Sequence, residues 1–248
     1  MKSGFLAAVA ACSLMLAAPA MAQGVKIGIL NDQSGVYADY GGKYSVEAAR
    51  MAIEDFGGEV LGQKIEMITA DHQNKPDVGV NIARNWIDNE KVDIITDTPN
   101  SGVALAVSNL AKEKNSIVLN SGAATADLTG KACSPNTIQW VNDAWATGNT
   151  TAAAMMQRGG KDWYFVTVDY ALGKGIEAEA TNYIEKHGGK VLGSSKHPLG
   201  TSDFASFLLQ AQGSKAKVIG LANAGGDTIN AVKQAAEFGI QQGGQTMV

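Results

Sequence analysis

The feature that most constrains the fold is a seven-residue segment that occurs twice. Phe56–Gly62 (FGGEVLG) returns as His187–Gly193 (HGGKVLG), and the match extends upstream at the same offset, where Gly42 aligns with Gly173. A helix often ends on glycine before the next strand, so chance explains a repeated Gly-Gly pair more readily than a match extending over about 20 residues. The repeat therefore predicts two lobes of similar topology.

Apolar runs rich in β-branched residues alternate with stretches that have helical spacing, such as Tyr44, Ala48 and Met51. The runs that predict strands are Val25–Leu30, Ile65–Ala70, Val92–Thr96, Ile117–Asn120, Trp163–Val168 and Val218–Ala222. Continuous apolar runs are typical of strands buried on both faces of a parallel sheet. The alternation predicts an α/β fold in which each lobe is a parallel sheet flanked by helices.

Two loops hold equivalent positions in the two copies of the repeat. Asp32–Gly41 and Asp169–Gly173 each follow a predicted strand and precede a predicted helix. Open parallel sheets bind ligands at the carboxyl ends of their strands, where a crevice forms and helix N-termini offer free N–H groups. Two such edges that face one another predict a cleft between the lobes.

The first 22 residues have the order of a secretory signal peptide. One lysine precedes the apolar run Phe5–Ala18, and Ala20-Met21-Ala22 supplies a cleavage site before Gln23. The apolar run is shorter than the roughly 20 residues that a membrane-spanning helix needs. Val9–Cys12 also fits a lipoprotein cleavage box, although further apolar residues follow it instead of a polar linker. We therefore expect residues 1–22 to be a signal peptide and the mature protein to be periplasmic.

The mature chain must be stabilised by its core. Only Cys133 remains after cleavage, so no disulfide can form within the chain even in an oxidising compartment. Hydrophobic residues make up 45% of the sequence and the net charge is −4. This composition is ordinary for a globular protein and offers no basic patch for nucleic acid, so no nucleic-acid partner is expected.

The sequence resembles the periplasmic binding proteins of the branched-chain amino acid (Leu/Ile/Val) type, whose partners are ABC transporters. The segments that carry the resemblance are Val25–Ile29, Ser34–Gly41, Asn100–Gly102, Asn120–Thr125, Leu128-Thr129 and Asp169–Gly173. The resemblance implies two α/β lobes joined by crossing strands, which close on a ligand like a flytrap. It places the first crossing near 139–143, and hence lobe one at 23–141 and lobe two at 142–248. Family members are longer, so both lobes are expected to be incomplete and the chain to be truncated at its C-terminus.

The resemblance also implies a function. We expect the extracytoplasmic solute-binding component of an ABC importer, a monomer that captures an amino acid, an aromatic acid or another small carboxylate by hinge closure. Its partners would be the ligand and a membrane permease. The alternative is a ligand-sensing module of a receptor or regulatory system, because the same lobes serve both uses.

In lobe one the resemblance implies contacts to the carboxylate of the ligand. Ser101, beside Asn100, matches a hydroxyl that binds carboxylate, although a serine at a helix start can instead cap the helix. The next turn has Ala124 where the family has threonine, which leaves the hydroxyls of its neighbours and its backbone N–H groups. The candidates in this turn are Ser121, Gly122, Ala123 and Thr125. Tyr40 matches an aromatic side chain of the cleft wall.

In lobe two the sequence departs from the family. Leu172 stands where a tyrosine is common, and Tyr170 lies two positions earlier. A second expected aromatic is replaced by the small stretch 223–226, which leaves room for a bulkier or planar ligand, with Asn223 and Asp227 as polar contacts. Trp140, at the predicted crossing where relatives carry arginine, is a further candidate for the cleft.

No pattern in the sequence predicts an enzyme. His72, His187 and His197 share no metal-ligand spacing, and the H-E-x-x-H, C-x-x-C and G-x-S-x-G motifs are missing from the sequence. Asp71 beside His72 could act as an acid and a base, but an aspartate at a strand end before Pro76 more often supports a turn. We therefore expect neither a metal, nor a cofactor, nor catalysis.

Overall fold

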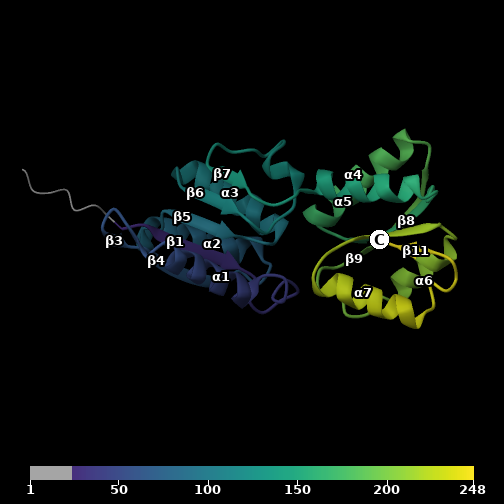
Figure 1. Cartoon of the computed structure of the whole chain (residues 1–248), viewed down its shortest axis with the longest axis horizontal. Coiled ribbons are helices and arrows are strands. Elements are labelled where there is room, and N and C mark those ends of the chain that lie inside the picture. The colour runs from purple at the N-terminus through teal and green to yellow at the C-terminus, as the bar shows by residue number, and fades with distance from the viewer. Residues whose placement is uncertain (1–23) are drawn as a thin grey trace, which may run out of the picture.

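The computed structural model describes residues 24–248, in which the two copies of the repeat lie in two lobes, each built on its own parallel sheet. The predicted signal peptide lies outside the described residues. Figure 1 shows the first sheet and its helices, coloured purple to teal, in one half of the molecule and the second set, green to yellow, in the other. The predicted fold class, two α/β lobes with helix-flanked parallel sheets, is confirmed.

Lobe one has a five-stranded sheet of order β4-β1-β5-β6-β7, in which every pairing is parallel. Its strands and helices are β1 Lys26–Asn31, α1 Gly42–Asp55, β2 Glu59–Val60, β3 Gln63–Lys64, β4 Glu66–Asp71, α2 Pro76–Asn85, the π-helical turn η1 Trp86–Glu90, β5 Ile94–Asp97, α3 Ser101–Lys114, β6 Ile117–Asn120, the 3-10 turn η2 Ala126–Leu128 and β7 Thr137–Gln139.

Lobe two has a four-stranded parallel sheet of order β11-β10-β8-β9. Its elements are α4 Ala144–Gln157, β8 Asp162–Val168, α5 Ala171–Lys186, β9 Lys190–His197, α6 Ala205–Gly213, β10 Val218–Ala222, α7 Gly226–Glu237 and β11 Thr246–Met247. The chain passes from β7 to α4 over residues 140–143, and the N–H group of Ala144 donates to the carbonyl oxygen of Ala124 at 2.6 Å. This short connection brings the carboxyl edge of the first sheet beside the helices of lobe two.

The core of lobe one lies between the sheet and the α2–α3 pair. Leu30, Ile95 and Val107 are fully buried there, and the ring of Trp86 lies against the backbone of β1 at Gly28. A β-carbon at Gly28 would come within 2.5 Å of that ring, so only glycine fits beneath the tryptophan. Trp86 therefore fixes the position of α2 relative to the first strand, whose carboxyl end leads into the cleft.

The repeat has different structures in its two copies. In lobe one the residues after the Gly-Gly turn form the β2–β3 hairpin, and Gly62 lies in its turn at a φ of 75°. In lobe two the equivalent residues enter β9 directly, and the register of β9 on β8 shifts by one residue before Gly193. The shared segment therefore marks the end of an equivalent helix, α1 or α5, while the following strand pairs differently in each lobe.

The predicted loop Asp169–Gly173 is shorter than expected, because α5 begins at Ala171 and includes Leu172 and Gly173. Gly173 is required by close packing: a β-carbon there would lie 2.2 Å from the carbonyl oxygen of Val168. The first turn of α5 therefore lies directly on the end of β8.

No helix among residues 24–248 is both long and apolar enough to cross a membrane. Within the same residues, no cluster of histidine, cysteine and carboxylate side chains has the composition of a metal site. Cys133 is a free, exposed thiol.

Candidate functional site

A cavity of about 160 Å³ lies between the two lobes. Its walls are largely apolar, and both lobes contribute. The lining residues are Tyr37, Tyr40, Pro99, Gly122, Ala124, Val141, Asn142, Thr147, Leu172, Ile176, Asn223 and Ala224. Most of them lie at the carboxyl edges of the two sheets or at the connection between the lobes, which is where the parallel topology predicts a cleft. The volume is several times the roughly 30 Å³ that one water molecule occupies in the liquid, so the cavity suits a small ligand.

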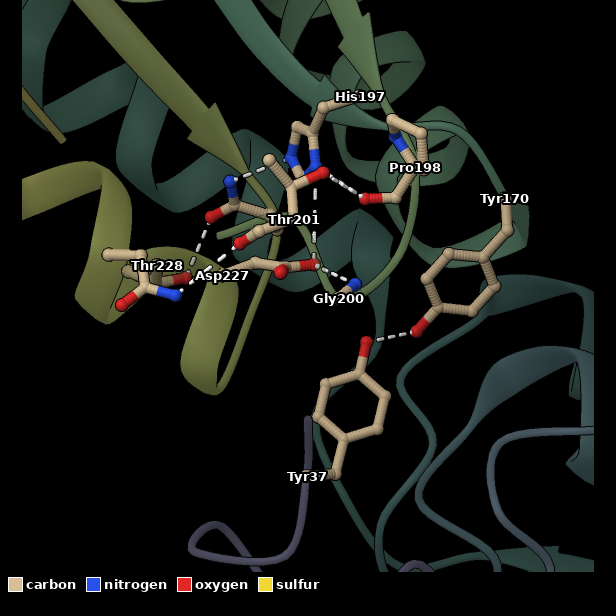
Figure 2. Close-up of polar contacts among 10 residues, drawn as sticks. Tyr37, Tyr170, His197, Pro198, Gly200, Thr201, Asp227 and Thr228 are labelled. Atoms are coloured by element: carbon tan, nitrogen blue, oxygen red, sulfur yellow. Dashed lines mark hydrogen bonds and ion pairs between the residues drawn. The ribbon is translucent and has the colours of Figure 1, made fainter. Parts of the chain in front are cut away.

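The lobes touch beside this cavity where the loop 32–41 of lobe one meets the loops before α5 and α7 of lobe two. The N–H group of Gly226 donates to the carbonyl oxygen of Val36 at 3.0 Å, and the hydroxyl groups of Tyr37 and Tyr170 are hydrogen-bonded to each other. Figure 2 shows these two tyrosines pointing at one another from opposite lobes. Burial raises the pKa of both hydroxyls, so each stays protonated at neutral pH. Tyr170, predicted to contact the ligand, bonds to the opposite lobe and is not among the residues that line the cavity.

The small stretch 223–226 is divided between the cavity and this contact. Asn223 and Ala224 line the cavity, whereas Gly225 and Gly226 lie against Val36 and its neighbour. A β-carbon at Gly225 would come within 2.6 Å of the Val36 carbonyl oxygen. Lobe one thus fills the space that the two glycines leave.

At the start of α3, Asn100 and Ser101 have different surroundings. The side-chain oxygen of Asn100 accepts from the N–H groups of Gly102 and Val103 at 2.9 and 3.1 Å, so Asn100 is the helix cap. Ser101 is fully buried, and its hydroxyl has no hydrogen-bond partner in the described part of the chain. Because capping is done by Asn100, the hydroxyl of Ser101 has no role in the cap, and Ser101 is not among the residues that line the cavity.

The turn after β6 is held by the side chain of Asn120. Its amide donates to the carbonyl oxygen of Ala123 at 2.6 Å and accepts from the N–H group of the same residue at 2.9 Å. Gly122 lines the cavity, while Ala123 is buried against the start of α3 and Thr125 is buried as the cap of η2. Of the turn residues proposed from the sequence, Gly122 is thus the one in the cavity wall.

Ser121 and Trp140 lie on a different surface. Together with Thr96, Leu119 and Ile138 they line a hollow on the face of the first sheet opposite α2 and α3. The side chain of Trp140 is 80% exposed there. Residues two apart on a strand share a face, so Trp140 follows Ile138 onto this side and away from the cavity.

Sequence reasoning missed a buried carboxyl group beneath the cleft edge of lobe one. Asp97 ends β5 at a φ of 80°, and its Oδ2 accepts from the side-chain amide of Asn31 at 2.9 Å. Burial raises the pKa of this carboxyl group. A left-handed backbone at a buried aspartate is uncommon, and such outliers gather near functional sites.

In lobe two, a polar network lies directly behind the cavity wall (Figure 2). Asn223 bonds to His197, and Asp227 accepts from the N–H group of Gly200 at 3.2 Å. Asp227 is 1% exposed, so it lies behind Asn223 and does not line the cavity. Burial raises the pKa of Asp227. Tyr40, in contrast, is exposed at the rim, with its ring edge-on to that of Tyr37.

Several other residues of the wall have no local signal in the sequence. Thr147 and Ile176 come from the helices α4 and α5, where their spacing is that of ordinary amphipathic positions. Val141 and Asn142 lie in the connection between the lobes. Tyr37 lies within the loop 32–41, which the sequence places at the cleft because it is equivalent to the loop after β8.

Comparison with known proteins places this geometry in a family. A family model described as "Periplasmic binding protein" matches residues 24–248. Leu/Ile/Val-binding protein homolog 4 of Brucella abortus is 26% identical over 246 residues, 94% of this chain and 59% of that protein.

Solved structures of the same family are similar to this chain in sequence and in fold. A periplasmic binding protein from Burkholderia mallei is 47% identical with a TM-score of 0.88, over 90% of this chain and 60% of that chain. A solute-binding protein of an ABC transporter from Rhodopseudomonas palustris BisB5, in complex with 3,4-dihydroxybenzoic acid, is 27% identical with a TM-score of 0.83, over 90% of this chain and 61% of that chain. The chain thus spans about 60% of the length of the relatives it matches. It belongs to the periplasmic binding protein family.

Proposed function

We propose that this protein is the extracytoplasmic solute-binding component of an ABC importer and that it captures a small carboxylate between its lobes. The observation that carries the proposal is the interlobe cavity, whose wall is shared by α4 and α5 of lobe two and the sheet edge of lobe one. A ligand that contacts both lobes favours the closed arrangement, because its binding free energy depends on their proximity.

The edge of lobe one suits the carboxylate end of the ligand. Gly122 exposes its backbone to the cavity and lies against Pro99, and the hydroxyl of Ser101, two residues after Pro99, is buried without a partner. A buried hydroxyl that lacks a partner costs free energy, and a ligand oxygen can recover that cost. We assign Ser101 and the turn around Gly122 to carboxylate recognition.

The remaining wall suits an apolar body. Leu172, Ile176 and Val141 offer aliphatic surface, and Tyr37 and Tyr40 offer ring faces. An aromatic acid matches both ends of such a cavity, and the Rhodopseudomonas relative named above was solved with a dihydroxybenzoic acid. We therefore place aromatic carboxylates first among the candidate ligands, ahead of branched-chain amino acids.

The proposed cellular setting follows from the same function. Residues 1–22 would direct the chain to the periplasm, and the closed, liganded form would dock on a membrane permease as a monomer. Release of the ligand to the permease would require the Tyr37–Tyr170 contact to open.

The experiment is a thermal-shift screen of the mature protein, expressed from its whole reading frame, against aromatic carboxylates, amino acids, amides and sugars. A ligand that binds only the folded state raises Tm in proportion to the logarithm of its concentration. We expect the largest shift from a carboxylate, with no turnover of the compound. A shift confined to sugars or amides, or conversion of the ligand, would contradict the proposal.

A further inference from the structure

The polar network behind the cavity wall fixes which hydrogen-bonding group lobe two can offer to a ligand. The network begins at His197, which is fully buried at the end of β9. Its ring packs edge-on against Phe204, with ring centres 4.7 Å apart, so the imidazole is held in one orientation.

The tautomer of His197 follows from its partners. Its Nδ1 lies 2.9 Å from the carbonyl oxygen of Pro198, and a carbonyl oxygen can only accept a hydrogen bond. Nδ1 must therefore carry the proton, which the carboxyl group of Asp227, 4.0 Å from the same nitrogen, also favours. In the neutral ring Nε2 is then left without a proton and can only accept.

This tautomer in turn orients Asn223. Its side chain lies 3.1 Å from Nε2 of His197, so the amide must present an N–H group to the histidine and not its oxygen. The amide oxygen of Asn223 accepts from the hydroxyl of Thr228 at 2.7 Å. The second N–H bond of the amide is the one donor of this side chain that these two contacts leave uncommitted, whereas the oxygen is already held by Thr228.

We infer that Asn223 is a specificity-determining residue that donates a hydrogen bond to the ligand, and that His197 is the positioning residue that fixes the orientation of the Asn223 amide. Asn223 is 8% exposed and lines the cavity, which places the amide at the lobe-two end of the site. The inference rests on the proposed function and narrows it. The preferred ligand carries, besides its carboxylate, a hydrogen-bond acceptor such as a ring hydroxyl or carbonyl oxygen.

The chain allows a matched pair of variants at position 197. In His197→Gln the side-chain oxygen lies near the position of Nε2 and can still accept from Asn223. In His197→Asn the amide reproduces Nδ1 and its bond to Pro198, but the acceptor for Asn223 is lost. Both variants remove the aromatic ring, so a purely structural role would affect them alike.

The test has two readouts. The first is ¹⁵N NMR of the histidine rings in the mature protein, assigned by the loss of one signal pair in His197→Gln; we expect Nδ1 protonated and Nε2 unprotonated. The second is calorimetric titration of the wild type and variants with benzoate and with the three monohydroxybenzoates. At least one hydroxybenzoate should bind roughly five- to tenfold more tightly than benzoate to the wild type and to His197→Gln. That preference should vanish in Asn223→Ala and His197→Asn.

Each outcome decides a separate point. If the ring signals show a proton on Nε2 and none on Nδ1, the positioning role of His197 is wrong whatever the ligand. If benzoate and its hydroxylated forms bind the wild type equally, the specificity role of Asn223 is wrong while the proposed function stands. If none of the four compounds binds, the proposal of an aromatic ligand is wrong, and the NMR result still decides which nitrogen of His197 carries the proton.

Discussion

At the scale of single residues, the start of α3 separates the capping role of Asn100 from the ligand-binding role proposed for Ser101. Asn100 satisfies two N–H groups of the first helical turn, and the buried hydroxyl of Ser101 satisfies none. The sequence pattern Asn-Ser before an apolar helix could not decide which residue was the cap, because both are favoured at that position. The backbone geometry decides it in favour of the asparagine.

Substitution should separate the two roles. Asn100→Ala should lower the free energy of unfolding by about 1 kcal/mol, the usual cost of losing a cap. Ser101→Ala should leave stability nearly unchanged, since it removes a polar group that lacks a partner, but should weaken carboxylate binding. Chemical denaturation and calorimetric titration of both variants measure the two effects. The same loss of affinity in both variants, with equal stability, would contradict the division.

His72 makes the stability of lobe one depend on pH. It is fully buried after β4, its Nδ1 accepts from the N–H group of Asn74 at 3.0 Å, and burial lowers its pKa to about 4. The folded state holds the neutral ring, whereas the unfolded chain takes up a proton near pH 6.5. Stability is therefore complete above pH 6.5 and is lost as the pH falls towards 4, by at most roughly 3 kcal/mol.

The variant His72→Asn isolates this contribution. The asparagine oxygen can accept the same N–H group but does not titrate, so the fall in stability between pH 6.5 and 4.5 should be smaller than in the wild type. Urea denaturation at both pH values gives the two differences. Parallel pH profiles for wild type and variant would assign the acid sensitivity to other groups.

At the scale of elements, the six strands predicted from apolar runs are present within two residues of their expected ends. Strands β1 and β8 are largely buried, so their apolar sequences carry the signal without help from context, whereas the edge strand β4 has no buried residue. The β2–β3 hairpin and the early start of α5 could not be predicted, because the same Gly-Gly turn leads to different strand pairings in the two lobes. Those pairings depend on neighbouring strands that are distant in sequence.

The loop before α7 is shaped by the opposite lobe, and Gly225 shows this most directly. Its φ of 61° is unfavourable for other residues, and a β-carbon would also lie 2.9 Å from the ring of Tyr37. Gly225→Ala should therefore favour the open arrangement and weaken ligand binding by roughly tenfold, the effect of 1.4 kcal/mol. Small-angle scattering, through the radius of gyration, and calorimetric titration measure the two effects.

Gly188→Ala is the matched control. Gly188 has a φ of 80° in the same lobe, but no heavy atom lies within 4 Å of the position its β-carbon would take. Both variants incur backbone strain, so both should melt at a lower temperature than the wild type. Only Gly225→Ala should expand the molecule; equal radii of gyration for the two variants would show that the interlobe contact does not hold the lobes together.

At the scale of the whole molecule, the repeat and the parallel-sheet topology predict two lobes with a cavity between them. The residues of the cavity wall cannot be predicted in this way, because the wall combines helix residues such as Thr147 and Ile176 with loop residues from the other lobe. Trp140 illustrates the limit: it directly follows β7, but its side chain lies on the face of the sheet away from the cavity. Which face a side chain takes at a strand end depends on a register of one residue.

The most direct test of the account fills the cavity from each lobe in turn. Ala124→Leu and Ala224→Leu place a larger apolar side chain in the same space from lobe one and lobe two. The calorimetric affinity for the compound with the largest thermal shift should fall more than roughly tenfold in both variants, while their melting temperatures without ligand stay close to that of the wild type. Undiminished affinity in both folded variants would show that the ligand binds elsewhere.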